Sequence, residues 1–249
     1  MEGNALGDLI DGLVPAFAAA PRPTRIDACP CGNCGWQDTV ETLLRTPLTR
    51  LGPDELGRYA FSVLNTVGSA EDLRYFAPRI LHLSLTDELL LPDLELIADA
   101  LARARWRSWP EAPYLHKLFD ALWADVLHNT TEWWDAEAVL CALGAAELRI
   151  DGHLAAWARL DTPPAVERLH DLVRTRLHLS RDGLLRPQNA YWQQDGPAYR
   201  TLLDWLNADG PHTAAAAVEA AFARATATTG PDLLEQLVAV HDVLTTHRS

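Results

Sequence analysis

Apolar residues recur every three or four positions along most of the chain, a spacing that places them on one face of an α-helix. In the segment 53–67 they stand at i, i+3, i+4, i+7, i+8 and i+11, and the segment 73–81 repeats this pattern. Similar stripes occupy residues 94–101, 115–126, 199–206 and 218–225. The spacing predicts a helix in each segment, and each stripe needs a neighbouring helix to cover it.

Helix starts are also readable from the sequence. Glycine followed by proline stands ahead of four helical segments, at residues 52–53, 196–197, 210–211 and 230–231. Proline suits the first helical position, where its missing N–H is no loss, so we expect four helices to begin there. Ser69 and Asp72 form a capping-box pattern for another helix, and we expect Pro78 to kink or divide that helix.

Strand patterns are nearly absent, and the best candidate is the short segment 147–150. The sequence therefore predicts an all-α fold of about ten or eleven helices of ordinary length. Short connections indicate antiparallel helix pairs, which build either a HEAT-like α-solenoid or an irregular helical bundle. We expect one domain over residues 1–249, with a candidate seam at 182–196, where the helical periodicity is lost.

Composition and charge narrow the classes of partner. The chain has 249 residues, of which 48% are hydrophobic, and its net charge is −13. This charge repels nucleic acid and anionic membrane surfaces, and no apolar run reaches the roughly 18 residues of a membrane span. Glu2, Asp8 and Asp11 occupy the place of a basic leader region, so we expect an N-terminal helix and a cytoplasmic protein.

Three of the four cysteines lie within six residues, as Cys29, Cys31 and Cys34 in the pattern C-x-C-x2-C. Glycine and proline between them favour the tight turn of a metal knuckle, in which thiolates approach one zinc ion at about 2.3 Å. A closed structural site needs a fourth ligand, which Cys141 or a histidine such as His82 would supply. The sequence thus leaves two alternatives, a zinc ion or no cofactor.

A second interpretation of the same residues is redox chemistry. Cys31 and Cys34 form a C-x-x-C pair just ahead of the helix predicted over 38–45, and a helix N-terminus lowers the pKa of a thiol. Thioredoxin-like proteins carry this motif between a strand and a helix, and no strand pattern precedes it here. A third interpretation is that the cysteines are free thiols with no functional role.

The block that follows the cysteines resembles an uncharacterised family of bacterial proteins with an N-terminal cysteine knuckle. The resemblance covers residues 29–83 and rests on these residues: Arg58, Tyr59, Phe61, Asp72, Phe76, Pro78 and Arg79. The chain departs from the pattern at Val67, where the family has an aromatic residue, and in its cysteine spacing. The resemblance implies a helical architecture and brings no activity with it.

Histidine and aspartate suggest a metal-dependent hydrolase of the HD type as an alternative function. One such site would use His153, His170, Asp171 and Asp242. His170 lies on an apolar stripe, where a hydrogen-bonded core histidine would also lie, and adjacent helical residues point about 100° apart. The sequence contains no G-x-S-x-G, P-loop, G-x-G-x-x-G or H-E-x-x-H motif, which argues against an enzyme.

Nine tryptophans offer candidate anchors for a partner protein. Adjacent residues cannot both face one core layer, so we expect an exposed ring near Trp133, Trp134, Tyr191 and Trp192. The preferred hypothesis is a non-catalytic helical-repeat module whose acidic surface binds a protein, with a metal knuckle as a structural element. The alternatives are the hydrolase and the thiol redox protein.

Overall fold

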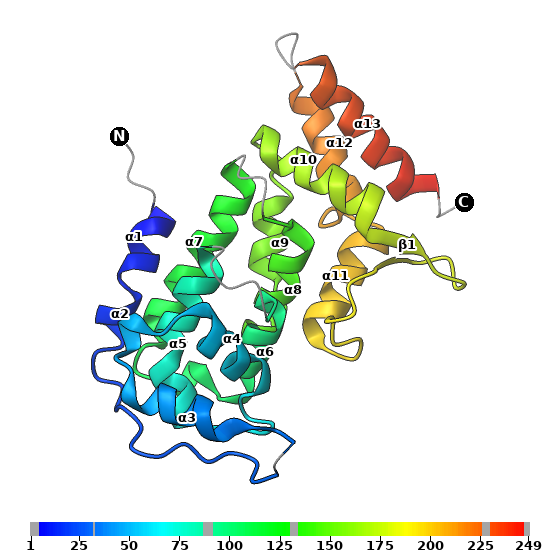
Figure 1. Ribbon diagram of the computed structural model, residues 1–249. Coiled ribbons are helices and arrows are strands. Elements are labelled where there is room, and N and C mark those ends of the chain that lie inside the picture. The colour runs from blue at the N-terminus through cyan, green and yellow to red at the C-terminus, as the bar shows by residue number, and fades with distance from the viewer. Residues whose placement is uncertain (1–4, 32, 87–91, 130–133, 226–229, 247–249) are drawn as a thin grey trace. The chain divides into compact units, whose positions relative to one another are not determined.

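The structure, a computed structural model, describes residues 5–31, 33–86, 92–129, 134–225 and 230–246 (Figure 1). The protein is mostly helical, with 66% of its residues in helices and one small two-stranded hairpin. The described residues contain thirteen α-helices, of which twelve have seven residues or more. This number exceeds the predicted ten or eleven because helices as short as α2 are too short to carry a recognisable apolar stripe.

Most elements follow one another along the chain with short connections, but a longer segment, residues 17–35, joins α2 to α3 (Figure 1). The α-helices are α1 (Ala5–Asp11), α2 (Leu13–Ala16), α3 (Trp36–Arg45), α4 (Pro53–Ser62), α5 (Ala70–Leu85), α6 (Leu94–Arg103), α7 (Ala112–His128), α8 (Ala136–Glu147), α9 (Asp151–Trp157), α10 (Pro163–Asp171), α11 (Pro197–Asn207), α12 (Ala214–Arg224) and α13 (Pro231–Thr246). The 3-10 helices are η1 (Leu48–Arg50) and η2 (Trp106–Ser108), a π-helical turn is η3 (Leu172–Arg176), and the strands are β1 (Leu177–Leu179) and β2 (Leu185–Pro187).

The chain divides into two compact units, residues 1–121 and residues 122–249. The division falls within α7, so it does not coincide with any loop. Residues 182–196, where the helical periodicity is lost, lie inside the second unit and include part of the hairpin turn, strand β2 (Leu185–Pro187) and the loop that follows. The candidate cysteines 29, 31 and 34 belong to the first unit.

The first unit is organised around α5, which packs against α1, α2, α4 and α6. Its inward face contributes Phe76 and Ile80, both fully buried. The predicted capping box is present, because the Ser69 hydroxyl accepts from the Asp72 N–H at 3.2 Å and the Asp72 carboxylate accepts from the Ser69 N–H at 2.8 Å. The helix continues through Pro78, which is buried, so of the two expectations, a kink or a division, the division is wrong.

One more helix prediction needs correction in the first unit. The stripe 53–67 predicts one helix, but α4 ends at Ser62 and the chain then turns, with Leu64 at a φ of 65°. Val63 and Val67 pair with each other as an isolated bridge and are still buried. The turn therefore keeps both apolar side chains in the core without extending the helix, and the stripe alone does not distinguish the two arrangements.

Tryptophan side chains form the centre of the second unit. The Trp157 ring is fully buried, stacks on Trp205 with ring centres 5.6 Å apart and meets Trp123 edge to face at 5.4 Å. Trp157 donates its ring N–H to the Ala165 carbonyl oxygen at 2.9 Å, and Trp123 donates to the His153 carbonyl oxygen at the same distance. These three tryptophans therefore fill the core of the unit; Trp123 and Trp157 also satisfy their ring N–H groups there, whereas the buried Trp205 ring N–H has no hydrogen-bond partner among the described residues.

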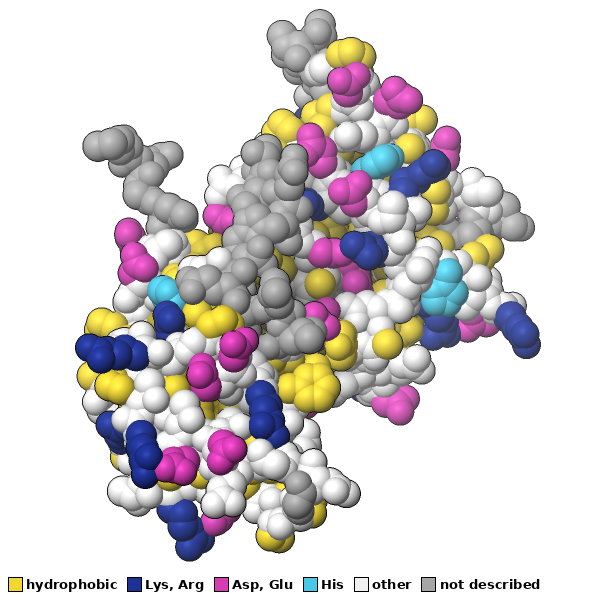
Figure 2. Space-filling model, viewed as in Figure 1, with side chains coloured by type: hydrophobic (Ala, Val, Ile, Leu, Met, Phe, Trp, Pro, Cys, Tyr) yellow, Lys and Arg dark blue, Asp and Glu magenta, His cyan; other side chains and the backbone are white. Residues whose placement is uncertain are grey.

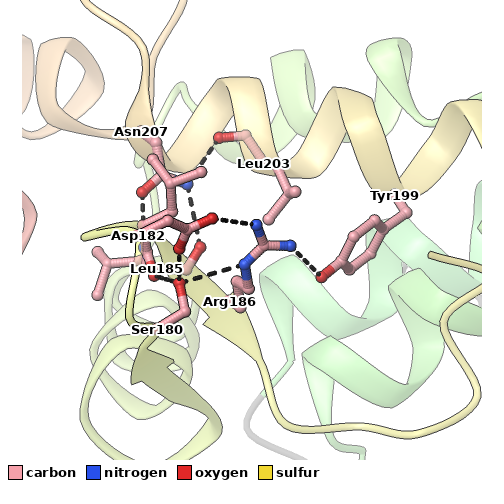
Figure 3. Close-up of polar contacts among 8 residues, drawn as sticks. Ser180, Asp182, Leu185, Arg186, Tyr199, Leu203 and Asn207 are labelled. Atoms are coloured by element: carbon pink, nitrogen blue, oxygen red, sulfur yellow. Dashed lines mark hydrogen bonds and ion pairs between the residues drawn. The ribbon is translucent and has the colours of Figure 1, made fainter. Parts of the chain in front are cut away.

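The hairpin β1–β2 is antiparallel and is held by polar side chains from its own turn and from α11 (Figure 3). Arg186 donates to Asp182 at 2.7 Å and to the Ser180 hydroxyl at 3.2 Å. The Asn207 side-chain amide accepts from the Leu185 N–H at 2.7 Å and donates to the Leu185 carbonyl oxygen at 3.0 Å. Asn207 thus makes the two hydrogen bonds to the Leu185 backbone that a neighbouring strand would otherwise make.

The predicted boundaries of the second unit are correct in part. α11 and α13 begin at Pro197 and Pro231, as does α4 at Pro53 in the first unit, so three of the four glycine–proline predictions are confirmed. α12 begins later, at Ala214, because the Thr213 hydroxyl caps it by accepting from the Ala216 N–H. The strand predicted over 147–150 is absent, since Glu147 ends α8 and Leu148 turns the chain with a φ of 63°.

Candidate metal centre

The cysteine knuckle consists of Cys29, Cys31 and Cys34. The segment that leads into it is extended and is held by backbone hydrogen bonds on one side. The Cys29 N–H donates to the Thr66 carbonyl oxygen at 2.7 Å, and the Gly68 N–H donates to the Asp27 carbonyl oxygen at 2.7 Å. Ala28 forms an isolated bridge with Val67 between these two bonds. The turn that follows α4 therefore holds the entry to the knuckle in an extended form.

The other side of the knuckle is held by Arg58 of α4. Its guanidinium donates to the carbonyl oxygens of Cys34 and Gly35, at 2.5 and 3.1 Å, and to the Thr39 hydroxyl at 2.8 Å. The same group lies over the Trp36 ring, 4.5 Å from its centre. Gly35 has a φ of 54°, which glycine adopts at little steric cost, and turns the chain directly into α3.

The three knuckle sulfur atoms lie together. Cys31 Sγ is 3.1 Å from Cys29 Sγ and 3.0 Å from Cys34 Sγ, and all three sulfurs are within 4.8 Å of one another. In a tetrahedral zinc site with bonds of about 2.3 Å the sulfurs stand about 3.8 Å apart, so small side-chain rotations bring all three to bonding distance. The cysteines form no disulfide, and Cys31 is exposed to solvent.

Hydrogen bonds among the thiols shift the pKa values of Cys31 and Cys34 in opposite directions. Bonds from the Cys34 and Cys29 thiols to the Cys31 sulfur lower the pKa of Cys31 from 9.0 to about 7. The same bond to Cys31 stabilises the protonated form of its neighbour and raises the pKa of Cys34 to about 12. Cys31 is therefore the first of this pair to become a thiolate, which is the form that binds metal and acts as a nucleophile.

The residues proposed to complete the zinc site lie elsewhere. Cys141 is buried in α8 of the second unit, with 1% of its surface exposed, and His82 lies on α5. Neither is a member of the sulfur group, which contains three ligands within the described part of the chain. The structure thus brings together three of the four predicted cysteine ligands.

The histidine and aspartate set is not brought together as a ligand group. His153 lies beside Glu147, with 3.6 Å between its Nε2 and the carboxylate, and its ring lies against Trp123. His170 contacts the carboxylate of Asp171 at 3.8 Å. Asp242 lies on α13, and the cysteine trio is the only group of three or more metal-ligating side chains among the described residues.

The predicted partner-binding residues have different environments. Trp134 and Trp192 are buried, with 7% and 6% exposure, and the Trp192 ring N–H donates to the buried carboxylate of Glu137. Tyr191 is 41% exposed, and Trp133 lies outside the described residues. On the face shown in Figure 2, acidic side chains are interspersed with basic ones over each unit.

The sequence reasoning missed Arg58 and Trp36 as parts of the site. Arg58 has one sequence signal, its place in the family-like block, but no spacing rule connects it with the cysteines 24 residues earlier. Its role depends on the packing of α4 beside α3, which are in contact in the first unit. Only the tertiary structure places the guanidinium against the backbone of the knuckle.

Comparisons of the chain with protein-family models, with curated proteins and with solved structures give no match. Among the described residues, no helix combines the length and the apolar character that crossing a membrane requires. The basis for a function is therefore the chain's own side chains, above all the three thiols of the knuckle.

Proposed function

We propose that this protein is a non-catalytic helical binding module that holds one zinc ion through Cys29, Cys31 and Cys34. The observation that carries the proposal is the grouping of the three sulfur atoms within 4.8 Å on a short loop. Thiolates are soft ligands that suit zinc, and zinc binding would fix the short loop that carries the three cysteines.

The surroundings of the knuckle support a structural role for the metal. Both ends of the loop are hydrogen-bonded to the segment 58–68, at Thr66 on one side and through Arg58 on the other. A metal ion between these two anchors would connect the extended segment to the start of α3. Its binding energy would then contribute to the folding of this part of the first unit.

The helical architecture supports a binding role. Sequence neighbours such as α4 with α5 and α12 with α13 pack together, as helix pairs do in HEAT-like arrays, and such arrays expose grooves to partner proteins. The net charge of −13 favours a basic protein partner, with nucleic acid and membranes disfavoured. The affinity for such a partner would weaken as salt is added. An affinity independent of salt would contradict the proposal that charge attraction contributes to binding.

Elemental analysis tests the metal site directly. The full chain, purified without chelator or metal-affinity resin, is expected to contain about one zinc ion per chain. The variant Cys31→Ser/Cys34→Ser is expected to contain none. Cys141→Ala is the matched control, because it removes the buried cysteine of the second unit and leaves the sulfur group intact.

Two results would contradict the proposal. One is wild-type protein without zinc even after anaerobic reconstitution with an excess of the ion. The other is zinc retained in full by the double serine variant, which would instead favour a metal site formed by the histidine and aspartate residues. Loss of zinc in Cys141→Ala, with the fold intact by circular dichroism, would assign a ligand role to the buried cysteine.

A second candidate is a thiol redox function, favoured by the 3.0 Å between the sulfurs of Cys31 and Cys34. A disulfide requires about 2.05 Å, so a further approach of about 1 Å would form the bond. In that reaction the two thiols give two electrons and two protons to a disulfide of a partner protein, which becomes a dithiol.

Equilibration with mixtures of reduced and oxidised glutathione distinguishes the two candidates. A redox protein would show a reversible Cys31–Cys34 disulfide, with a midpoint between about −270 and −120 mV, as dithiol oxidoreductases do. A structural zinc site would instead protect all three thiols from maleimide until a chelator is added. The full chain is used in both arms, and peptide mass spectrometry identifies the modified cysteines.

A further inference from the structure

A groove opens beside the cysteine knuckle in the first unit. It is lined by the extended segment 26–31 and by α3, and its volume is about 1260 Å³ including its open mouth. Cys29 and Cys31 both lie on its wall, so a metal ion bound to the knuckle would stand at the edge of the groove. We call this feature the knuckle groove.

The three sulfur ligands leave a zinc ion one coordination position short. Tetrahedral zinc takes four ligands, and within the described ranges the ligand group ends at three. Since no fourth side chain of the described residues joins the group, the remaining position is open to a ligand that another molecule supplies. Because Cys29 and Cys31 form part of the groove wall, the groove is the direction from which such a ligand would come.

The remaining lining of the knuckle groove is largely apolar. Ile26 and Trp36 are buried in its wall, while Val40 and Leu44 of α3 are partly exposed toward it. At the rim, Arg45 and Glu41 form an ion pair at 2.5 Å. The part of this groove that a ligand can fill, about 690 Å³, lies within the range of about 300–1,000 Å³ usual for ligand pockets and accommodates the side chains of a short peptide segment.

The charge of the site indicates which ligand the segment carries. Three thiolates and one Zn²⁺ have a net charge of −1, in a chain that already has a net charge of −13. A fourth thiolate would add another negative charge, whereas a neutral imidazole adds none, and three cysteines with one histidine make an established zinc ligand set. Charge complementarity therefore favours histidine over cysteine.

We propose that the knuckle groove binds an apolar segment of a partner protein whose histidine supplies the fourth ligand of the metal held by Cys29, Cys31 and Cys34. This inference rests on the proposed function, since it requires the metal. It adds the place of contact and the chemistry of the partner. The partner would contribute both a metal bond and the burial of apolar side chains against Val40 and Leu44.

Cobalt(II) substitution makes the fourth ligand visible in the full chain. The protein is loaded anaerobically with cobalt(II), and sulfur-to-cobalt absorption in the near ultraviolet reports the thiolate ligands. An acetylated and amidated tripeptide with histidine between two leucines is then titrated in. We expect the visible cobalt bands to shift on binding, and the sulfur-to-cobalt absorption to persist because the three thiolates remain bound.

Two altered peptides and one protein variant separate the contributions of the ligand and of the groove. Replacing both leucines by glycine is expected to weaken binding about tenfold, because apolar burial in the groove is lost. Replacing histidine by alanine is expected to abolish the spectral shift. Val40→Glu is expected to reduce the preference for leucine over glycine to about twofold, and a cobalt titration of this variant first verifies its metal site.

The outcomes distinguish failure of the inference from failure of the proposed function. Absence of sulfur-to-cobalt absorption before any peptide is added would overturn the metal site and the inference together. A cobalt site that no peptide perturbs would overturn the inference and leave the metal site standing. Tighter binding of a peptide with cysteine between the two leucines would overturn the assignment of histidine as the ligand. Equal binding of the leucine and glycine peptides would overturn the assignment of the groove.

Discussion

The guanidinium of Arg58 lies over the Trp36 ring, 4.5 Å from its centre, and donates at the same time to the backbone of the cysteine knuckle. One exposed arginine of α4 therefore connects the start of α3 to the loop that carries the thiols. Arginine suits this position because its planar fork stacks on an aromatic ring while its N–H groups reach two carbonyl oxygens.

Replacing Arg58 is expected to weaken the metal site without touching a ligand. Arg58→Ala would lower the free energy of unfolding by about 1 kcal/mol and the zinc affinity by about tenfold, because the knuckle loses one anchor. Arg58→Lys would recover only part of the affinity, since lysine lacks the planar fork. Competition with a chromophoric chelator measures the affinity, and Arg50→Ala, an exposed arginine of η1, is the control. Equal affinities in all four proteins would refute the anchoring role.

Zinc binding is expected to release fewer protons as the pH rises through about 7. Thiols must lose their protons to bind the metal, and the pKa of Cys31, lowered to about 7 by bonds from Cys34 and Cys29, marks where this thiol ionises in the free protein. Above that pH, Cys31 already lacks its proton, so the number released per zinc ion falls by one. Calorimetry at pH 6 and pH 8, in pairs of buffers with different ionisation enthalpies, gives this number. An identical proton count at both pH values would contradict the assignment.

The hairpin turn is expected to contribute a pH-dependent part of the stability of the second unit. Hydrogen bonds from Ser180 and then Arg186 lower the pKa of Asp182 from 3.8 to about 2 (Figure 3). Because the folded pKa is lowered, the contribution is complete above about pH 4 and is lost as the pH falls toward 2. The stability difference between the wild type and Asp182→Asn should therefore be largest near pH 5 and shrink toward pH 2. Asp195→Asn, in an exposed part of the following loop, should show no such trend in urea unfolding.

Substitutions at Tyr59 and Gly68 in the first unit are expected to have non-additive effects on the free energy of unfolding. Gly68 has a φ of 71°, and a Cβ there would lie 2.7 Å from the Tyr59 hydroxyl oxygen, so Gly68→Ala should cost about 2–3 kcal/mol. The Tyr59 hydroxyl is buried with no hydrogen-bond partner among the described residues, so Tyr59→Phe should raise stability by about 1 kcal/mol.

The double variant tests the contact between Tyr59 and Gly68. Removing the hydroxyl relieves the closest contact of the new methyl group, so the double variant should be at least about 0.5 kcal/mol more stable than the sum of the single changes. The strain of the positive φ remains, so the rescue stays partial. Urea unfolding of the four proteins measures the coupling, and strict additivity would show that the two residues do not compete for space.

Much of the helical architecture followed from short-range patterns in the sequence. Apolar spacing predicted the helices α5, α6, α7, α11 and α12, and proline after glycine marked the starts of α4, α11 and α13. These features are local, because helix periodicity and capping involve residues within four positions of each other. The four-residue helix α2 and the end of α4 at Ser62 were missed, the latter because a stripe continues through a buried turn such as 63–67.

The cysteine spacing by itself determined that Cys29, Cys31 and Cys34 could meet, because residues so close along the chain share one turn. Only the tertiary structure decided that Cys141 and His82 lie outside the sulfur group, and that Arg58 anchors the knuckle against α4. It also decided that the cysteines border an apolar groove along α3. Contacts between residues far apart in sequence depend on how helices pack, and the periodicity of a single chain gives the face that packs but not its partner.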